Sequence, residues 1–252
     1  MRKNMLKGLI HIHTNFSYDG KNTVREWAAF LRAKGYNFVC LTEHDDDFDD
    51  AKMAGMVEEC RKVSTPSFHM IPGLEFRCAN KVHILGLGLT KFYRTTDPIE
   101  AVKFIRTNNG ASVIAHPRGY EGNITKELLK TVDCVEVWNG AKDSRFFPHP
   151  EVLERYKGWK EVNPNLIAIG GADVHGMDSY FQLDVHTADN AGTEWNVRNL
   201  RDGGLRKICG RYFSISSGEP RLPLTCLWGM RLVYDHVKTW RDKQKGKPDP
   251  SR

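Results

Sequence analysis

The sequence contains no apolar run long enough to cross a membrane. A spanning helix needs about 20 consecutive apolar residues, and every apolar run here is interrupted well before that length. The first residues, MRKNMLKGLIHIH, lead into a histidine-bearing segment where a secretory signal would carry an apolar stretch and a small-residue cleavage site. We therefore expect a cytoplasmic protein without a membrane partner.

Cysteine is sparse and unpaired along the chain. The six cysteines occur singly, with no CxxC pair, which excludes a small domain held together by a dense disulfide framework. Because several lie in apolar, strand-like runs, we expect buried and reduced thiols. The positions are Cys40, Cys60, Cys78, Cys134, Cys209 and Cys226.

The sequence also lacks internal repeats, low-complexity segments and a strong charge imbalance. Its net charge is +6, and much of the excess lies from Lys238 to the chain end. This balance weakly favours an anionic partner, although a charged chain end is usually just solvated surface. With 40% hydrophobic residues among 252, the chain can build one large core or two small ones.

Strand-like and helix-like patterns alternate along most of the chain. Apolar runs typical of strands cover residues 9–14, 37–44, 68–76, 82–89, 111–117, 134–139 and 166–175, and helical patterns cover residues 23–35, 49–63, 98–110, 124–132, 150–162 and 193–204. Such alternation predicts right-handed βαβ units and a mainly parallel sheet. About seven strands without a linker favour an α/β fold with a closed or nearly closed barrel.

The last part of the chain predicts a separate helix. Apolar residues such as Leu224, Leu227, Trp228 and Leu232 recur at helical spacing after Pro223. We expect a barrel over residues 1–218, a C-terminal helix over 219–243 that packs on it, and a disordered tail over 244–252. A helix that binds a partner or a membrane surface is the less favoured alternative.

Side chains able to bind metal ions stand at or near most of the predicted strand ends. The C-terminal ends of the strands of a parallel barrel meet at one mouth, where such folds carry their chemistry. Residues two apart on a strand point to the same face, so His11 and His13 should lie together, as should Asp173 and His175. The full set is His11, His13, Asp19, His44, Glu75, His83, His116, Asp173 and His175.

This concentration of titratable groups predicts a multinuclear metal site. A lone buried histidine is usually a hydrogen-bonded core residue, but six histidines and three carboxylates at one mouth would be prohibitively costly without a cation among them. Imidazole and carboxylate ligands suit zinc, manganese or iron. The absence of cysteine near these positions argues against a structural thiolate site.

The motifs HIHT, LTEHD, PGLE, HILGLG, IAHP and GADVHG, in this order between Met5 and Tyr180, together resemble the polymerase-and-histidinol-phosphatase (PHP) superfamily. The resemblance implies a distorted (β/α)7 barrel with a trinuclear centre of divalent ions. Carried over by motif, His11, His13, Glu75 and Asp173 would hold one ion, and His83, His116 and a bridging Glu75 a second. Asp19, His44 and His175 would hold the third.

The expected reaction is hydrolysis of a phosphate ester. Metal ions a few ångströms apart lower the pKa of a shared water and stabilise charge on a phosphoryl group, so we expect a metal-bridging hydroxide as the nucleophile. Arg118, two residues after His116, is the first candidate for binding the substrate phosphate, followed by Arg145 and Arg77.

Several other polar residues lie near the motifs and could serve either the site or the fold. Glu43 and Asp45 flank His44 and could orient metal ligands. The resemblance suggests a similar or substrate-lining role for Glu136 and Asn139, although hydrogen bonding within the core explains both equally well. The remaining histidines match no ligand motif; they are His69, His149, His186 and His236.

The predicted substrate is a small phosphomonoester or the terminal phosphate of a nucleotide. The segment between His83 and His116 leaves room for one helix rather than an inserted domain, and no aromatic and basic platform for stacking bases is evident. A nuclease on short oligonucleotides, with the basic chain end as its track, is the main alternative. A hydrolase of C–N or lactone bonds rests on fold analogy alone, and a non-catalytic metal-binding module is disfavoured because all nine ligand positions are filled.

Overall fold

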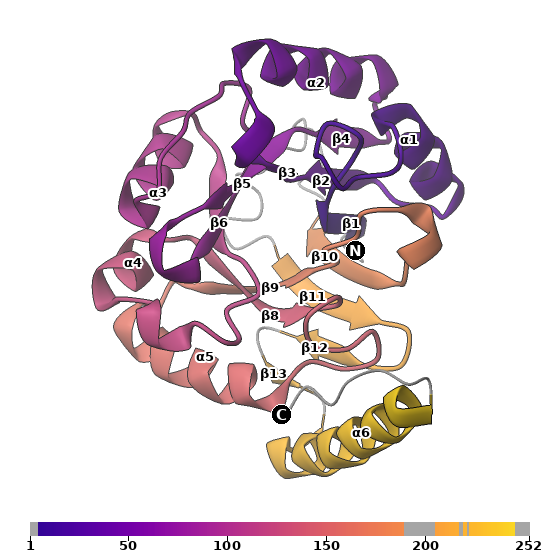
Figure 1. Cartoon of the computed structure of the whole chain (residues 1–252), viewed down its shortest axis with the longest axis vertical. Helices are drawn as coiled ribbons and strands as arrows, with labels where there is room; N and C mark the ends of the chain where they lie inside the picture. The colour runs from indigo at the N-terminus through magenta and orange to yellow at the C-terminus, as the bar shows by residue number, and fades with distance from the viewer. Residues whose placement is uncertain (1–4, 189–204, 217–218, 221, 245–252) are drawn as a thin grey trace.

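The strands of the protein form two sheets surrounded by helices. The computed structural model describes residues 5–188, 205–216, 219–220 and 222–244 (Figure 1). The first sheet has the order β13 (Glu219–Pro220), β12 (Ser214–Ser216), β11 (Leu205–Gly210), β10 (Leu183–Ala188), β1 (Met5–Ile12), β2 (Phe38–Leu41) and β4 (His69–Ile71). The second has the order β3 (Glu43–His44), β5 (Gly73–Arg77), β6 (His83–Leu87), β7 (Ala111–Ile114), β8 (Cys134–Asn139) and β9 (Ile167–Gly171).

Five of the helices form an arc around the strands, and the sixth lies beside β11 to β13 (Figure 1). They are α1 (Val24–Ala33), α2 (Asp50–Val63), α3 (Pro98–Thr107), α4 (Lys126–Thr131), α5 (Pro150–Val162) and α6 (Leu224–Gln244). Short 3-10 turns η1 (Asp45–Asp47), η2 (Ala79–Lys81), η3 (Glu121–Asn123) and η4 (Met177–Ser179) connect some of the elements.

Helix α1 shows how local sequence sets these elements. The Thr23 hydroxyl accepts a hydrogen bond from the backbone N–H of Glu26, and the Glu26 carboxylate accepts one from the backbone N–H of Thr23, so the first turn is closed by a capping box. Trp27 and Leu31 lie one turn apart and are fully buried. Gly35 adopts a positive φ of 74° just after the helix, a conformation that favours glycine. The helix predicted over residues 23–35 is confirmed.

Two predicted strands are each divided between the sheets. Residues 37–44 form β2 and β3, and residues 68–76 form β4 and β5 on either side of Pro72. Pro72 has no N–H to donate, so the ladder ends there. At the crossing, a Cβ on Gly73 would lie 2.4 Å from the carbonyl oxygen of Gly86 and 2.5 Å from that of Leu41, so only glycine fits.

The prediction of a mainly parallel sheet is confirmed only in part, and the closed seven-stranded barrel is not confirmed. Strands β1 and β2, β2 and β4, β3 and β5, β7 and β8, and β8 and β9 pair parallel, but β6 pairs antiparallel with both β5 and β7. Residues 78–82 are too few for the crossover that a parallel pairing of β5 with β6 would need. Over the described ranges the hydrogen-bonding pattern contains no closed sheet. The sheets nevertheless meet where β1 and β9 end, since Ala172 and Asp173 donate backbone hydrogen bonds to Ile10 and His11.

The two faces of β1 belong to different cores. Leu9 packs in the large core that includes the helices, while Ile10 belongs to a smaller apolar cluster with residues of β2, β6, β7, β8, β9 and β10. That cluster draws on both sheets, so their inner faces pack on one another. Cys40 and Cys134 are buried there as expected, but Cys226 is exposed on α6.

Helix α6 occupies most of the predicted C-terminal helix over 219–243, but Glu219 and Pro220 form β13 and the helix begins at Leu224. Leu227 is fully buried, and Trp228 donates a hydrogen bond of 2.7 Å to the carboxylate of Glu154 on α5. Arg231 donates to the backbone oxygen of Asp143, 3.0 Å away. The predicted helix over residues 193–204 and nearly all of the predicted tail lie outside the described residues. No helix that the structure describes combines the length and apolar character required to cross a membrane.

Candidate metal centre

The end of β1 brings His11 and His13 to the edge where the two sheets meet. His11 is the extra residue of a bulge, because Ile10 pairs with Cys40 and Ile12 pairs with the very next residue of β2. The rings of His11 and His13 are 5.3 Å apart and neither is exposed to solvent. The two imidazoles therefore converge as predicted, although a bulge rather than regular strand alternation orients them.

Glu75 lies at the centre of the cluster. One of its carboxylate oxygens is 2.7 Å from His83 Nδ1 and 3.0 Å from His116 Nε2. The other lies 3.3 Å from His11 Nε2, 3.4 Å from His13 Nε2 and 3.3 Å from His44 Nδ1. Although burial alone would raise the pKa of Glu75, the imidazoles around it lower that pKa well below its usual value. A buried anion thus faces five histidines.

Asp19 and Asp173 complete the cluster on its other side. Asp19 lies 3.4 Å from His44 Nε2 and 3.3 Å from His175 Nε2. Asp173 lies 3.7 Å from His11 Nε2, and the ring of His175 stacks on His13 at 4.2 Å. The structure thus brings together all nine side chains that the sequence singled out.

The nitrogen and oxygen atoms of this cluster fit a group of metal ions. Seven buried side-chain nitrogen or oxygen atoms have no hydrogen-bond partner among the described residues, and four of them belong to the predicted ligands: His13 Nε2, Asp19 Oδ1, His44 Nδ1 and Asp173 Oδ2. Buried polar atoms without partners are rare because each carries a desolvation cost. Three overlapping triads also place ligand atoms within 4.8 Å of one another: His13, His44 and His175; His11, His13 and Asp173; His11, Glu75 and His116. Nitrogen and oxygen donors without thiolate suit zinc, manganese or iron.

Backbone strain is concentrated at the same residues. His11, His116 and Asp173 have φ values of 67°, 28° and 54°, in the left-handed region that residues with a Cβ seldom adopt. Each such residue costs on the order of 1–3 kcal/mol. The surrounding fold maintains this strain where three strands end, which is typical of a functional site.

Glu136 orients two of these histidines from β8. It accepts hydrogen bonds from His11 Nδ1 at 2.7 Å and from the backbone N–H of His116 at 2.6 Å, and its second oxygen also accepts from Asn139 at 2.9 Å. Burial alone would lower the pKa of His11, but the carboxylates around it, Glu136 foremost, raise that pKa well above its usual value. Glu136 keeps a proton on Nδ1 and leaves Nε2 directed into the cluster.

The room for Glu136 depends on Gly171 at the end of β9. A Cβ at Gly171 would lie 1.7 Å from Glu136 Oε1. We therefore expect Gly171→Ala to displace Glu136 and to release His11, lowering metal affinity about 10- to 100-fold, the range typical for loss of a group that orients a ligand. Chelator competition measures the affinity, and Gly158→Ala is a control because a Cβ at Gly158 meets no atom within 4 Å. Equal metal affinity in Gly171→Ala and Gly158→Ala would contradict the role given to Glu136.

Glu43 and Asp45, which flank His44, do not point into the cluster. Glu43 accepts hydrogen bonds from Thr14 and Ser17, and Ser17 also accepts one from the backbone of His44 at 3.0 Å. Burial raises the pKa of Glu43 to about 7 despite these hydrogen bonds. Asp45 accepts a hydrogen bond from the backbone of Arg77. Both acids hold the loops that carry the ligands.

The three candidate arginines occupy different surroundings. Arg118 lies 3.6 Å from the buried carboxylate of Asp143 and donates to a backbone oxygen. Arg77 pairs with Asp46 at 2.6 Å and donates to Tyr18, whose ring stacks on His44 at 5.3 Å. Arg145 lies over the ring of Phe181 at 5.4 Å. Tyr18 was not expected near the site, and only its position between Asp19 and the histidine motif could have suggested it.

The remaining histidines lie away from the cluster. His69 is on β4, His186 on β10 and His236 on α6, while His149 caps α5 and contacts the ring of Trp228 at 5.8 Å. None of them is in a potential metal-binding group among the residues that the structure describes.

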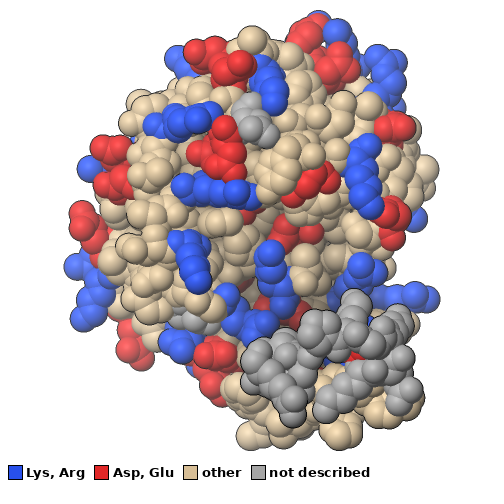
Figure 2. All heavy atoms as spheres, in the orientation of Figure 1, with Lys and Arg blue, Asp and Glu red and all other residues tan. Residues whose placement is uncertain are grey.

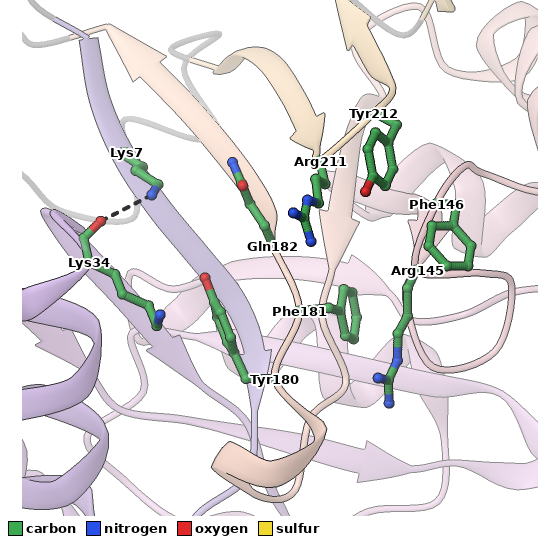
Figure 3. Close-up of a pocket in the computed structure, with 9 residues that line it drawn as sticks. All are labelled: Lys7, Lys34, Arg145, Phe146, Tyr180, Phe181, Gln182, Arg211 and Tyr212. Atoms are coloured by element: carbon green, nitrogen blue, oxygen red, sulfur yellow. Dashed lines mark hydrogen bonds between the residues drawn. The ribbon is translucent and has the colours of Figure 1, made fainter.

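A basic and aromatic surface lies next to the cluster, contrary to the expectation from the sequence. A cavity of about 610 Å³ is lined by Lys7, Lys34, Arg145 and Arg211 together with four aromatic rings (Figure 3). On the face shown in Figure 2, Lys and Arg side chains are spread among acidic ones. The cavity could not be expected from the sequence, because β1, the end of α1 and three separate loops each contribute one to three of its residues.

Comparisons with known proteins agree with the geometry. The model of the PHP domain family matches residues 10–181. A two-domain protein from Bacteroides vulgatus containing a predicted PHP-like metal-dependent phosphoesterase has a similar structure, with 17% identity and a TM-score of 0.63 over 82% of this chain; this chain covers 65% of that protein. No curated protein sequence matches significantly.

Two further solved structures share the fold. PsfC from Pseudomonas syringae matches 93% of this chain and 99% of its own length, with 13% identity and a TM-score of 0.58. A lesion-specific endonuclease from Pyrococcus furiosus matches 82% of this chain and 59% of its own length, with 13% identity and a TM-score of 0.57.

Proposed function

The chain belongs to the PHP domain family; on this premise we propose that it is a metal-dependent hydrolase of phosphate esters that releases the terminal phosphate of a nucleotide or a small phosphomonoester. The nine clustered side chains would hold two or three divalent ions, with Glu75 as a ligand that two of them could share. The two sheets then represent the family's distorted barrel, with the ligands at its mouth.

One observation carries this proposal. The carboxylate of Glu75 lies within 3.4 Å of five imidazole nitrogens, an arrangement that a purely structural core does not need. The unpartnered atoms of His13, His44, Asp19 and Asp173 are the donors that divalent ions would satisfy.

The residues of the chain prepare the site for an attack on phosphorus. Bound divalent ions supply an acidified water and positive charge for the phosphoryl oxygens. Glu136 keeps His11 in the tautomer with Nε2 free, and Glu75 provides negative charge at the centre. Arg118, as the phosphate-binding residue, would have to exchange its contact with Asp143 for the substrate.

A nuclease acting on short oligonucleotides is the second candidate. It is favoured by the basic and aromatic cavity beside the cluster, which removes the main reason for preferring a small substrate. An endonuclease of similar fold has been solved with a duplex that contains an abasic lesion. The preference between monoester and diester is therefore a matter for direct measurement.

The test is elemental analysis together with turnover of a substrate panel. The panel contains an aryl phosphomonoester, an aryl phosphodiester, histidinol phosphate, nucleotides and short oligonucleotides, each with manganese, zinc or iron. We expect two or three metal ions per chain and turnover of the monoesters. His13→Ala should lose both metal and hydrolysis, because His13 belongs to two of the triads. Diester preference would favour the nuclease, and full activity in a His13→Ala protein of known metal content would contradict the proposal.

A further inference from the structure

Two adjoining cavities lead away from the metal cluster. The first, of about 510 Å³, has the predicted metal ligand Asp173 in its wall and also contacts Arg145, Phe146 and Phe181. The second, of about 610 Å³, shares Arg145, Phe146 and Phe181 with the first and extends to Lys34 and Tyr212. We call the two cavities together the substrate groove. It connects the site of reaction with a surface built by distant parts of the chain.

The second cavity is strongly basic, while the first is lined by Asp143 and Asp173 as well as by cations. Lys238 and Arg241 of α6 line the first cavity, and Lys7, Lys34 and Arg211 line the second. No acidic residue is among the described residues that line the second cavity. Lys7 lies 3.5 Å from the buried carboxylate of Asp184 beneath it, whereas Lys34, Arg145 and Arg211 have no carboxylate partner in the described parts of the chain. Three cations are thus available to an anion.

Aromatic rings lie among these cations. Lys34 lies over the ring of Tyr180 at 5.1 Å, and Arg211 over the ring of Tyr212 at 5.4 Å. Phe146 and Tyr212 are 46% and 69% exposed with ring centres 6.1 Å apart. Rings this exposed contribute little to the core, and the solvent-facing part of each ring can stack on a flat ligand. Figure 3 shows these side chains around the same pocket.

We propose that the substrate groove binds a short single-stranded oligonucleotide that runs from the metal centre toward Tyr212. Cations and exposed rings that line one groove can contact the phosphates and the bases of a single strand, whose bases are free to stack. Two joined cavities exceed what one small phosphomonoester fills. The inference rests on the proposed function, because it takes the metal cluster as the point where a phosphate ester is hydrolysed.

The helix α6 acquires a function in this arrangement. Lys238 and Arg241 line the first cavity together with Asp173 and Val174, so these two basic residues near the chain end are part of the groove as well as solvated surface. Each cation that binds a phosphate releases counterions, and the affinity for the strand must then fall as the salt concentration rises.

The experiment measures binding of a fluorescein-labelled hexanucleotide to the full chain by fluorescence anisotropy. Metal is removed with chelator so that no hydrolysis occurs, and the salt concentration is varied. We expect Arg211→Gln combined with Tyr212→Ala to weaken binding at least tenfold and to reduce the salt slope by about one, as for loss of one phosphate contact. Lys103→Gln, an exposed cation on α3, is the matched control and should bind as the wild type does. Circular dichroism and thermal unfolding verify that each variant is folded.

The outcomes separate the groove from the proposed function. Equal affinity of the wild type and the double variant for the hexanucleotide would overturn the groove. So would binding of a duplex, or of a mononucleotide, that is as tight as binding of the hexanucleotide. If the double variant loses binding but metal-loaded wild type hydrolyses no phosphate ester, the groove stands and the proposed function fails. With hydrolysis present, the ratio of kcat/KM for the oligonucleotide to that for an aryl phosphate should fall at least tenfold in the double variant.

Discussion

Replacement of Glu75 by glutamine is expected to abolish both metal loading and hydrolysis. The carboxylate accepts from or faces five imidazoles through its two oxygens. Glutamine keeps the shape but removes the negative charge and turns an NH2 group toward at least two of those nitrogens. We expect no more than one ion per chain and a loss of about 10³-fold or more in kcat/KM, equivalent to about 4 kcal/mol.

Elemental analysis, turnover and thermal unfolding with and without chelator measure the effect of Glu75→Gln. A bound ion stabilises the folded state by mass action, so wild-type protein should unfold at a lower temperature in chelator, while the variant should show little of this difference. Glu59→Gln is the control, because Glu59 pairs only with Lys62 on the surface of α2. A Glu75→Gln protein with its full complement of metal and wild-type turnover would exclude Glu75 as the shared ligand.

The composition of the metal cluster could be predicted from the sequence because its ligands occur at strand ends. His44 ends β3 and Glu75 lies in the middle of the adjacent short strand β5, and the two residues are directly opposite in the pairing of these strands. A strand ending in a titratable residue brings that residue to a predictable edge of the sheet. No knowledge of helix packing was needed for this step.

The backbone conformations that orient the ligands could not be predicted from the sequence. The bulge at His11 and the positive φ values of His116 and Asp173 depend on how two sheets join, which no local propensity encodes. The same holds for Gly171, whose need for a missing Cβ becomes apparent only when Glu136 is placed against it. The antiparallel pairing of β5 with β6 was not predicted for a related reason. The connection between these strands is short, and the expectation of βαβ units did not consider its length.

The substrate groove was missed because it is a surface of tertiary structure. Lys7 and Lys34 belong to the first 35 residues, whereas Arg145, Arg211 and Tyr212 come from loops more than 100 positions later. Each is an ordinary exposed residue in its own segment, and only the pairing of β1 with β10 and of β10 with β11 brings them together. The expectation that no aromatic and basic platform exists did not take this tertiary arrangement into account.

Replacement of Glu136 by glutamine tests how far one residue outside the cluster controls it. Glu136 accepts from His11 and, through its other oxygen, from His116 N–H and Asn139. Glutamine has one oxygen, so in either orientation its NH2 group faces a donor. A buried donor left unsatisfied costs about 1–3 kcal/mol, and we expect a loss of this size in the free energy of unfolding, measured by denaturant titration.

The metal affinity of Glu136→Gln decides whether Glu136 positions His11 or merely stabilises the core. When glutamine presents NH2 to His11, it favours the tautomer with a proton on Nε2, the nitrogen that faces Glu75 and Asp173. That tautomer cannot bind a metal through Nε2, so metal affinity should fall about 10- to 100-fold at a temperature where the variant is fully folded. Glu127→Gln, exposed on α4, should change neither quantity. A destabilised Glu136→Gln protein with unchanged metal affinity would mean that the hydrogen bond to His11 serves the fold alone.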